Sequence, residues 1–112
     1  MSVKIYHNPE CGTSRNTLEM IRASGVEPEI VLYMETGWAR ETLSRLLADM
    51  SLRPRDVLRI SKSPAEALGL TDPSVSDEAL FEAMLEHPVL VNRPIVVTPK
   101  GTRLCRPSEE VF

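Results

Sequence analysis

Cysteine is scarce in this chain, whose 112 residues include only Cys11 and Cys105. A secreted domain of this size that relies on disulfide bonds usually carries more cysteines. The N-terminus also lacks the basic-then-apolar pattern of an export signal. We therefore expect a protein of the reducing cytoplasm.

Long apolar stretches are absent too, since no run of about 18 apolar residues occurs, and we expect no membrane span. The formal net charge of −3 argues against a general nucleic-acid-binding protein, which usually carries an excess of basic residues. An apolar content of 42% and a charged content of 26% are instead ordinary for a globular protein. From this length we expect residues 1–112 to form a single domain. We also expect the protein to be a monomer.

Several common active-site motifs are missing. The Cys-x-x-Cys pair of dithiol oxidoreductases is absent, because Ser14 occupies the position of the second cysteine. His7 and His87 lie far apart in sequence, and no cysteine–histidine cluster has the spacing of a metal site. Neither common glycine-rich phosphate loop occurs. The sequence thus predicts no metal ion and no bound cofactor.

The most informative segment that is present covers residues 7–16, His-Asn-Pro-Glu-Cys-Gly-Thr-Ser-Arg-Asn. It follows a β-favouring run and precedes a helix-like stretch, which places Cys11 at the start of a helix. The free N–H groups and partial positive charge of a helix N-terminus stabilise a thiolate and also bind oxyanions. His7 and Ser14 are candidates for further support of the thiolate. The alternative role for Cys11, a small buried apolar residue, fits its polar neighbours less well.

Local patterns predict both strands and helices. The predicted strands cover residues 4–7, 29–33, 95–98 and 102–105. The predicted helices cover residues 14–23, 40–50, 54–58, 63–69 and 76–86, and a last helix begins at Pro107. The clearest helical pattern lies in residues 40–50, where leucine and methionine recur at i, i+3, i+4 and i+7.

The order of these elements predicts an α/β fold. The first two strands, joined by one helix through short loops, form a βαβ unit with parallel strands. The last two strands, separated by Pro99-Lys100-Gly101, form an antiparallel hairpin. Together they predict an α/β sandwich built on a mixed four-stranded sheet, with helices in the middle of the chain.

Arginine is the natural ligand for an oxyanion, since its guanidinium donates in parallel to two oxygens. Arg93 and Arg106 flank the C-terminal hairpin, and each precedes a proline whose ring would restrict the backbone. These two arginines are therefore candidates, although chemistry alone does not choose among the 13 basic residues.

Two long blocks resemble the glutaredoxin-coupled arsenate reductases. The first block runs from residue 7 to residue 18, and the second covers residues 92–99 and 101–109. The resemblance implies a thioredoxin-like three-layer fold, βαβ followed by ββα, with a helical insertion at about residues 39–88. It also implies a cis peptide bond between Arg93 and Pro94.

The resemblance also implies roles for individual residues. Cys11 matches the family's nucleophile, and His7 and Ser14 match residues that support the thiolate. The oxyanion-binding arginines are matched by Arg59, Arg93 and Arg106. Of these, Arg59 comes from the resemblance alone.

The implied reaction is the reduction of arsenate to arsenite, as in arsenic detoxification. Cys11 would form a covalent adduct with arsenic, and glutathione as cosubstrate and glutaredoxin as partner would supply the remaining thiols. A single protein thiol then suffices, which accounts for serine at position 14. The alternative is a paralogue of the same fold that acts as a transcription regulator or as another thiol oxidoreductase. The regulators typically carry Cys-x-x-Cys, which Ser14 disfavours.

Overall fold

The computed structural model of the chain describes residues 3–60, 63–99 and 101–105. The chain divides into two compact units: Met1–Thr36 together with Arg93–Phe112, and Gly37–Asn92. The second unit is therefore inserted into the sequence of the first. Within the described ranges, no helix combines the length and the apolar character needed to cross a bilayer.

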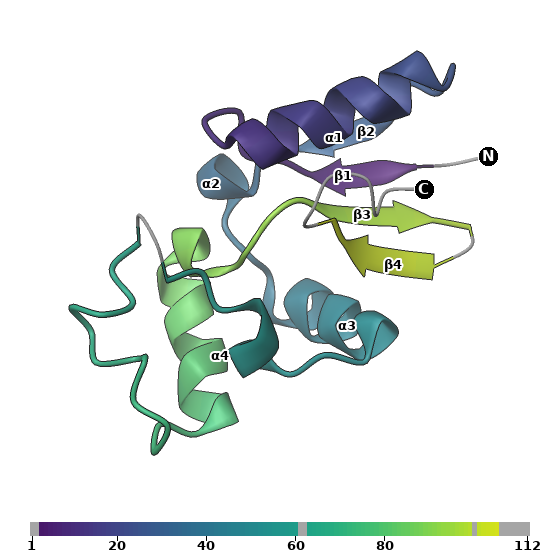
Figure 1. The fold of residues 1–112 in the computed structure, drawn as a ribbon. Coiled ribbons are helices and arrows are strands. Elements are labelled where there is room, and N and C mark those ends of the chain that lie inside the picture. Colours follow the sequence, from purple (N-terminus) through teal and green to yellow (C-terminus); the bar gives the residue numbers. More distant parts are fainter. Residues whose placement is uncertain (1–2, 61–62, 100, 106–112) are drawn as a thin grey trace. The chain divides into compact units, whose positions relative to one another are not determined.

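The first unit contains a four-stranded sheet in the order β2-β1-β3-β4 (Figure 1). Its strands are β1 (Lys4–Tyr6), β2 (Glu29–Val31), β3 (Ile95–Thr98) and β4 (Gly101–Leu104). β1 pairs in parallel with β2 and antiparallel with β3, which pairs antiparallel with β4. The predicted mixed sheet, the parallel βαβ unit and the C-terminal hairpin are confirmed.

One amphipathic helix, α1 (Gly12–Ala23), connects β1 to β2. Its Leu18 and Ile21 pack in an apolar cluster with side chains from β1, β3 and the end of the hairpin: Ile5, Val96 and Cys105. The helix begins at Gly12 rather than at the predicted residue 14, with Cys11 as its N-cap residue. The cluster therefore fixes α1, and with it the position of Cys11, against the sheet.

The strand predicted over residues 29–33 is wrong in its second half. β1 ends at Tyr6, and the His7 N–H still donates to the Val31 carbonyl at 2.9 Å before Asn8-Pro9 turns the chain away. Without a strand beside it, the chain turns at Leu32. The Leu32 carbonyl accepts hydrogen bonds from the N–H groups of Glu35 and Thr36. The result is the short helix α2 (Tyr33–Thr36).

The second unit is helical (Figure 1). Its helices are α3 (Arg40–Met50), the 3₁₀ turn η1 (Pro54–Val57), α4 (Asp77–Glu86) and the 3₁₀ turn η2 (Pro88–Leu90). Its most deeply buried side chains are apolar: Leu43, Val57, Leu80, Met84, Leu90 and Val91. The helices predicted over residues 40–50, 54–58 and 76–86 are confirmed to within one residue at each end.

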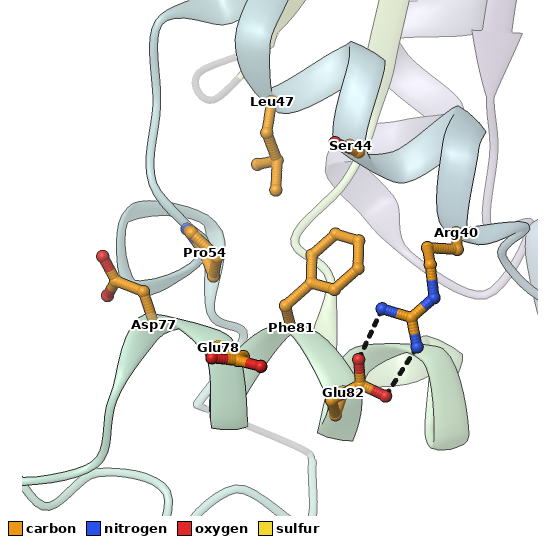
Figure 2. Close-up of a pocket in the computed structure, with 8 residues that line it drawn as sticks. All are labelled: Arg40, Ser44, Leu47, Pro54, Asp77, Glu78, Phe81 and Glu82. Atoms are coloured by element: carbon orange, nitrogen blue, oxygen red, sulfur yellow. Dashed lines mark hydrogen bonds and ion pairs between the residues drawn. The ribbon is translucent and has the colours of Figure 1, made fainter.

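A surface cavity of about 300 Å³ lies beside α3 and α4 in this unit (Figure 2). Leu47 and Phe81 form part of its apolar wall. Arg40 lies at one side, where its Nη1 and Nη2 atoms are 2.6 and 2.8 Å from the two carboxylate oxygens of Glu82. The Arg40 Cζ atom also lies 5.7 Å from the centroid of the Phe81 ring. These contacts connect the first turn of α3 to the middle of α4.

The helix predicted over residues 63–69 is wrong, because this segment forms turns. Its start signal is present, since the Ser63 Oγ accepts a hydrogen bond from the Ala65 N–H at 3.2 Å. Its stop signal is also present: Gly69 has a φ of 73°, and the Leu70 N–H donates back to the Ala65 carbonyl at 2.9 Å. The Leu68 N–H donates to the Pro64 carbonyl with helical spacing at 2.9 Å, but the Gly69 N–H donates to the Glu66 carbonyl, three residues back, at 3.0 Å, so the α-helical pattern does not continue. The helix predicted from Pro107 lies outside the described residues.

Candidate active site

Cys11 lies where β1 passes into α1. Its N–H donates to the Asn8 carbonyl at 3.0 Å, and its own carbonyl accepts the N–H of Arg15 at 3.0 Å. The Asn8 side chain shapes the turn, because its Oδ1 accepts the Glu10 N–H at 3.0 Å. Cys11 has extended backbone angles and is 8% exposed. The turn therefore presents the thiol at the N-terminus of α1, as the sequence predicts.

His7 and Ser14, which lie before and after this turn in the chain, form a buried hydrogen-bonded pair. The His7 Nδ1 and Ser14 Oγ atoms are 2.6 Å apart, and the same Oγ accepts the Asn8 N–H at 3.1 Å. His7 is 5% exposed and Ser14 is fully buried. The pair thus ties the end of β1, the turn and the first turn of α1 together. Sequence reasoning selected both residues but missed Asn8, which their network includes.

The environment of His7 favours the neutral imidazole. Burial, and after it the positive charges of Arg22 and Arg15, lower the pKa of His7 from its ordinary value of 6.5. A neutral imidazole has one nitrogen that accepts and one that donates. When the hydrogen is on Nε2 of His7, Nδ1 accepts the hydrogen bond and the Ser14 hydroxyl donates it. When the hydrogen is on Nδ1, that N–H donates to the Ser14 oxygen, and the Ser14 hydroxyl can donate to another acceptor.

Arg93 lies in the same unit as Cys11, at the entry to β3. It is 5% exposed, and its peptide bond to Pro94 is cis, as the resemblance implied. The Cys105 N–H donates to the Pro94 carbonyl at 2.9 Å, which joins this entry to the end of β4. The backbone that follows Arg93 is therefore bonded to the end of the hairpin.

Arg59 lies in the second unit. Its N–H donates to the Leu90 carbonyl at 2.7 Å, and its Nη1 donates to the Asn92 Oδ1 at 3.3 Å. The Asn92 N–H in turn donates to the Val57 carbonyl at 2.8 Å. Arg59 is thus bonded to the residue that immediately precedes Arg93 in the chain. Arg106, the other predicted oxyanion ligand, lies outside the described residues.

Arg15 is a further basic residue of this segment that sequence reasoning did not select. Its Nη1 donates to the Pro9 carbonyl at 2.8 Å, and a Cβ atom at Gly12 would lie 3.8 Å from its Nη2. The guanidinium therefore lies against the turn that carries Cys11. The only signal in the sequence is its position, four residues after the cysteine on the first turns of a helix.

Cys105 has a different environment from Cys11. It is fully buried in the apolar cluster with Ile5 and Val96, and its Sγ lies 3.8 Å from the Arg103 carbonyl oxygen. Cys105 is therefore a core residue, but the prediction of a strand over residues 102–105 is wrong by one position, because β4 ends at Leu104. In the described ranges, no group of three or more histidine, cysteine or acidic side chains is arranged to hold a metal ion.

Comparison with known proteins identifies close relatives over nearly the whole chain. The model of the ArsC family matches residues 6–112. An arsenate reductase of Escherichia coli is 57% identical over 111 residues, which cover 99% of this chain and 79% of the relative. An arsenate reductase of Rhizobium meliloti is 57% identical over 112 residues, which cover 100% of this chain and 80% of the relative. The solved structure of an arsenate reductase from Vibrio cholerae has a TM-score of 0.91 at 44% identity, covering 99% of this chain and 95% of that one.

Proposed function

Because the chain belongs to the ArsC family, we propose that it is an arsenate reductase in which Cys11 is the nucleophile. The observation that carries this proposal is the position of Cys11 as the N-cap residue of α1, in the same strand–turn–helix segment as the buried His7–Ser14 pair. The similarity to arsenate reductases of Escherichia coli and Rhizobium meliloti supports the choice of substrate.

The N-terminus of α1 favours the thiolate form of Cys11. Backbone N–H groups of the first turn and the helix dipole stabilise negative charge there, by about 0.3–1 kcal/mol at an exposed site. The Ser14 hydroxyl can add a hydrogen bond to the sulfur or to a bound oxyanion when His7 does not receive its proton. In this scheme His7 is a positioning residue that acts through Ser14.

The reaction begins with attack of the Cys11 thiolate on arsenic(V), which forms an S–As bond and releases hydroxide or water. Glutathione then attacks arsenic and displaces a second oxygen ligand. A glutaredoxin thiolate attacks the glutathione sulfur, so that a mixed disulfide forms and the electron pair of the broken S–As bond reduces arsenic to As(III). Hydrolysis of the remaining S–As bond releases arsenite and regenerates Cys11.

Arginine side chains neutralise the oxyanion during attack. Arg93 and Arg59, together with Arg106, are the proposed ligands, since a guanidinium donates to two oxygens at once. Support for Arg93 comes from its burial beside the hairpin, and support for Arg59 comes from its bond to Asn92. Because Cys11 must stay reduced and the thiol cosubstrates must be available, we place the reaction in the cytoplasm.

A coupled assay tests the proposal. Purified protein with glutathione, glutaredoxin and arsenate should form arsenite, and Cys11→Ser should form none, because an alcohol replaces the thiolate. Cys105→Ala is the matched control and should keep activity within about threefold, since its thiol takes no part. Absence of arsenite with the wild-type protein, or equal activity of Cys11→Ser, would contradict the proposal.

A further inference from the structure

A second cavity lies in the first unit, bounded by the turn that precedes Cys11 and by the start of α2. We call it the Met34 cavity. Its volume is about 250 Å³, and its lining consists of three residues from the turn and three from the segment after β2: Asn8, Pro9, Glu10, Leu32, Met34 and Glu35. Glu10 immediately precedes Cys11, whose N–H donates to the Asn8 carbonyl at 3.0 Å. One wall of the cavity is therefore part of the turn that holds the thiol.

The apolar part of the Met34 cavity is open to solvent. Tyr33, the first residue of α2, is 1% exposed, whereas the next residue, Met34, is 45% exposed. The single turn of α2 thus buries Tyr33 and leaves Met34 and Glu35 at the surface. Among the described residues of the first unit, Met34 is the only large apolar side chain that is exposed. A partner that covers it removes apolar surface from water, which favours binding.

The charged residues of the Met34 cavity are both acidic. Glu10 and Glu35 are exposed, and no basic residue belongs to the lining, Arg15 included. In the described ranges neither carboxylate forms an ion pair. The cavity beside α3 and α4 differs in this respect, because its Arg40 is already paired with Glu82 (Figure 2). The Met34 cavity therefore combines an apolar side chain with carboxylates that are complementary to a basic partner.

The proposed reaction requires a protein thiol to come close to Cys11. In its reductive step, a thiolate of the partner protein attacks a glutathione sulfur that is joined to Cys11 through arsenic. Because Cys11 is only 8% exposed and lies at the end of the turn, the partner must contact the surface beside this turn. The Met34 cavity borders the turn and carries the exposed apolar side chain that such a contact can bury.

We propose that the Met34 cavity is the docking surface for the thiol protein that completes the reaction. An apolar side chain of this partner enters the cavity beside Met34 and Pro9, and lysine or arginine side chains around its reactive thiol face Glu10 and Glu35. The two carboxylates raise the rate of encounter with a basic partner, and the apolar contact slows its dissociation. The choice of partner rests on the proposed function.

Thiol–disulfide exchange tests this surface without arsenate. Cys11 is converted to its mixed disulfide with glutathione in the Cys105→Ala protein, where it is the only cysteine. A glutaredoxin with lysine or arginine beside its reactive thiol is added in reduced form. Its thiolate attacks the glutathione sulfur, the S–S bond to Cys11 breaks, and Cys11 leaves as a thiolate while glutaredoxin holds the glutathione as a new mixed disulfide.

Free glutathione is the reference reactant, because it performs the same exchange and forms glutathione disulfide without a docking surface. The quantity to compare is the ratio of the second-order rate constant with glutaredoxin to that with free glutathione. A substitution that only alters the reactivity or access of Cys11 changes both rate constants, so it leaves this ratio unchanged. The ratio therefore reports docking.

Substitutions in the Met34 cavity should lower this ratio. We expect Glu10→Gln combined with Glu35→Gln to lower it about fivefold at low ionic strength, and Met34→Ser about threefold. Added salt should lower the ratio more in the parent protein than in the double variant, because salt screens the carboxylates. Glu41→Gln and Leu68→Ser are the matched controls, since both residues are exposed in the second unit, and they should leave the ratio unchanged.

Three outcomes would overturn the inference. The first is an unchanged ratio in both cavity variants. The second is an equal loss of rate with free glutathione, which would assign the cavity to glutathione itself. The third is a dimer of the parent protein that Met34→Ser dissociates in sedimentation, which would assign the cavity to a second copy of the chain. The exchange contains no arsenate, so its result is distinguishable from a failure of the protein to reduce arsenate in the coupled assay.

Discussion

The buried hydroxyl oxygen of Ser14 forms hydrogen bonds with both the imidazole of His7 and the N–H of Asn8. Ser14→Ala leaves both of these buried groups without their partner, so we expect the free energy of unfolding to fall by about 2 kcal/mol. Urea denaturation measures this change. Ser44→Ala, an exposed position on α3, is the control and should change stability by less than about 0.5 kcal/mol. Equal effects of the two substitutions would show that the buried network adds no stability.

The lowered pKa of His7 predicts a dependence of stability on pH. Between the lowered pKa of the folded protein and the ordinary value of 6.5, the unfolded chain binds more protons at this histidine than the folded protein does. The contribution of His7 to the free energy of unfolding is therefore largest above pH 6.5 and decreases as the pH falls.

His7→Asn removes the titration and keeps a polar side chain beside Ser14. Urea denaturation between about pH 7 and about pH 5 should show the wild-type protein losing stability relative to this variant as the pH decreases. His87→Asn, at the other histidine, is the control. A difference between wild type and His7→Asn that does not vary with pH would contradict the expectation.

Among the helices, α4 offers a direct test of capping. The Ser76 Oγ accepts the Ala79 N–H at 3.1 Å, as the sequence pattern predicts. Ser76→Ala should lower the free energy of unfolding by about 1 kcal/mol, while Ser76→Gly should lower it by only a few tenths. Thermal or urea unfolding ranks the three proteins. An unchanged free energy of unfolding in Ser76→Ala would mean that the hydroxyl contact does not stabilise the helix.

Elements with a long periodic pattern could be predicted from the sequence, and those set by tertiary contacts could not. The leucine spacing of α3 and the proline-bounded turn of the β3–β4 hairpin are local signals, and both predictions are confirmed. The end of β2 depends on where its neighbour β1 stops, which no pattern within residues 29–33 records. Residues 63–69 have their start and stop signals, but the hydrogen bonds change from the helical spacing after one turn, where Gly69 has a φ of 73°.

The residues of the candidate site likewise differ in whether a local sequence pattern could predict them. Cys11, His7 and Ser14 lie within eight residues of one another, so the strand–turn–helix pattern could identify them together. Arg59 is bonded to Asn92, a residue far along the chain, and local chemistry gives no reason to select it.

In the molecule as a whole, the two cysteines differ in access. Cys105 is fully buried in the apolar cluster, whereas Cys11 is 8% exposed at a helix N-terminus. Iodoacetamide should therefore modify Cys11 at least about tenfold faster than Cys105 in the native protein. Mass spectrometry of digested samples measures both rates, and denatured protein provides the control in which the rates converge. Faster labelling of Cys105 would contradict the burial described for it.

The Asn92 N–H donates to the Val57 carbonyl and the Arg59 N–H donates to the Leu90 carbonyl, so the chain segment between these two pairs forms a loop that is closed at its base. Residues 71–74 lie within this loop and are exposed. Since each doubling of loop length costs only about 0.6 kcal/mol, extra residues at this place need not disturb the anchored arginine. A peptide tag can therefore be inserted at residues 71–74. Relatives can also differ in length at this place while the backbone hydrogen bond of Arg59 is kept.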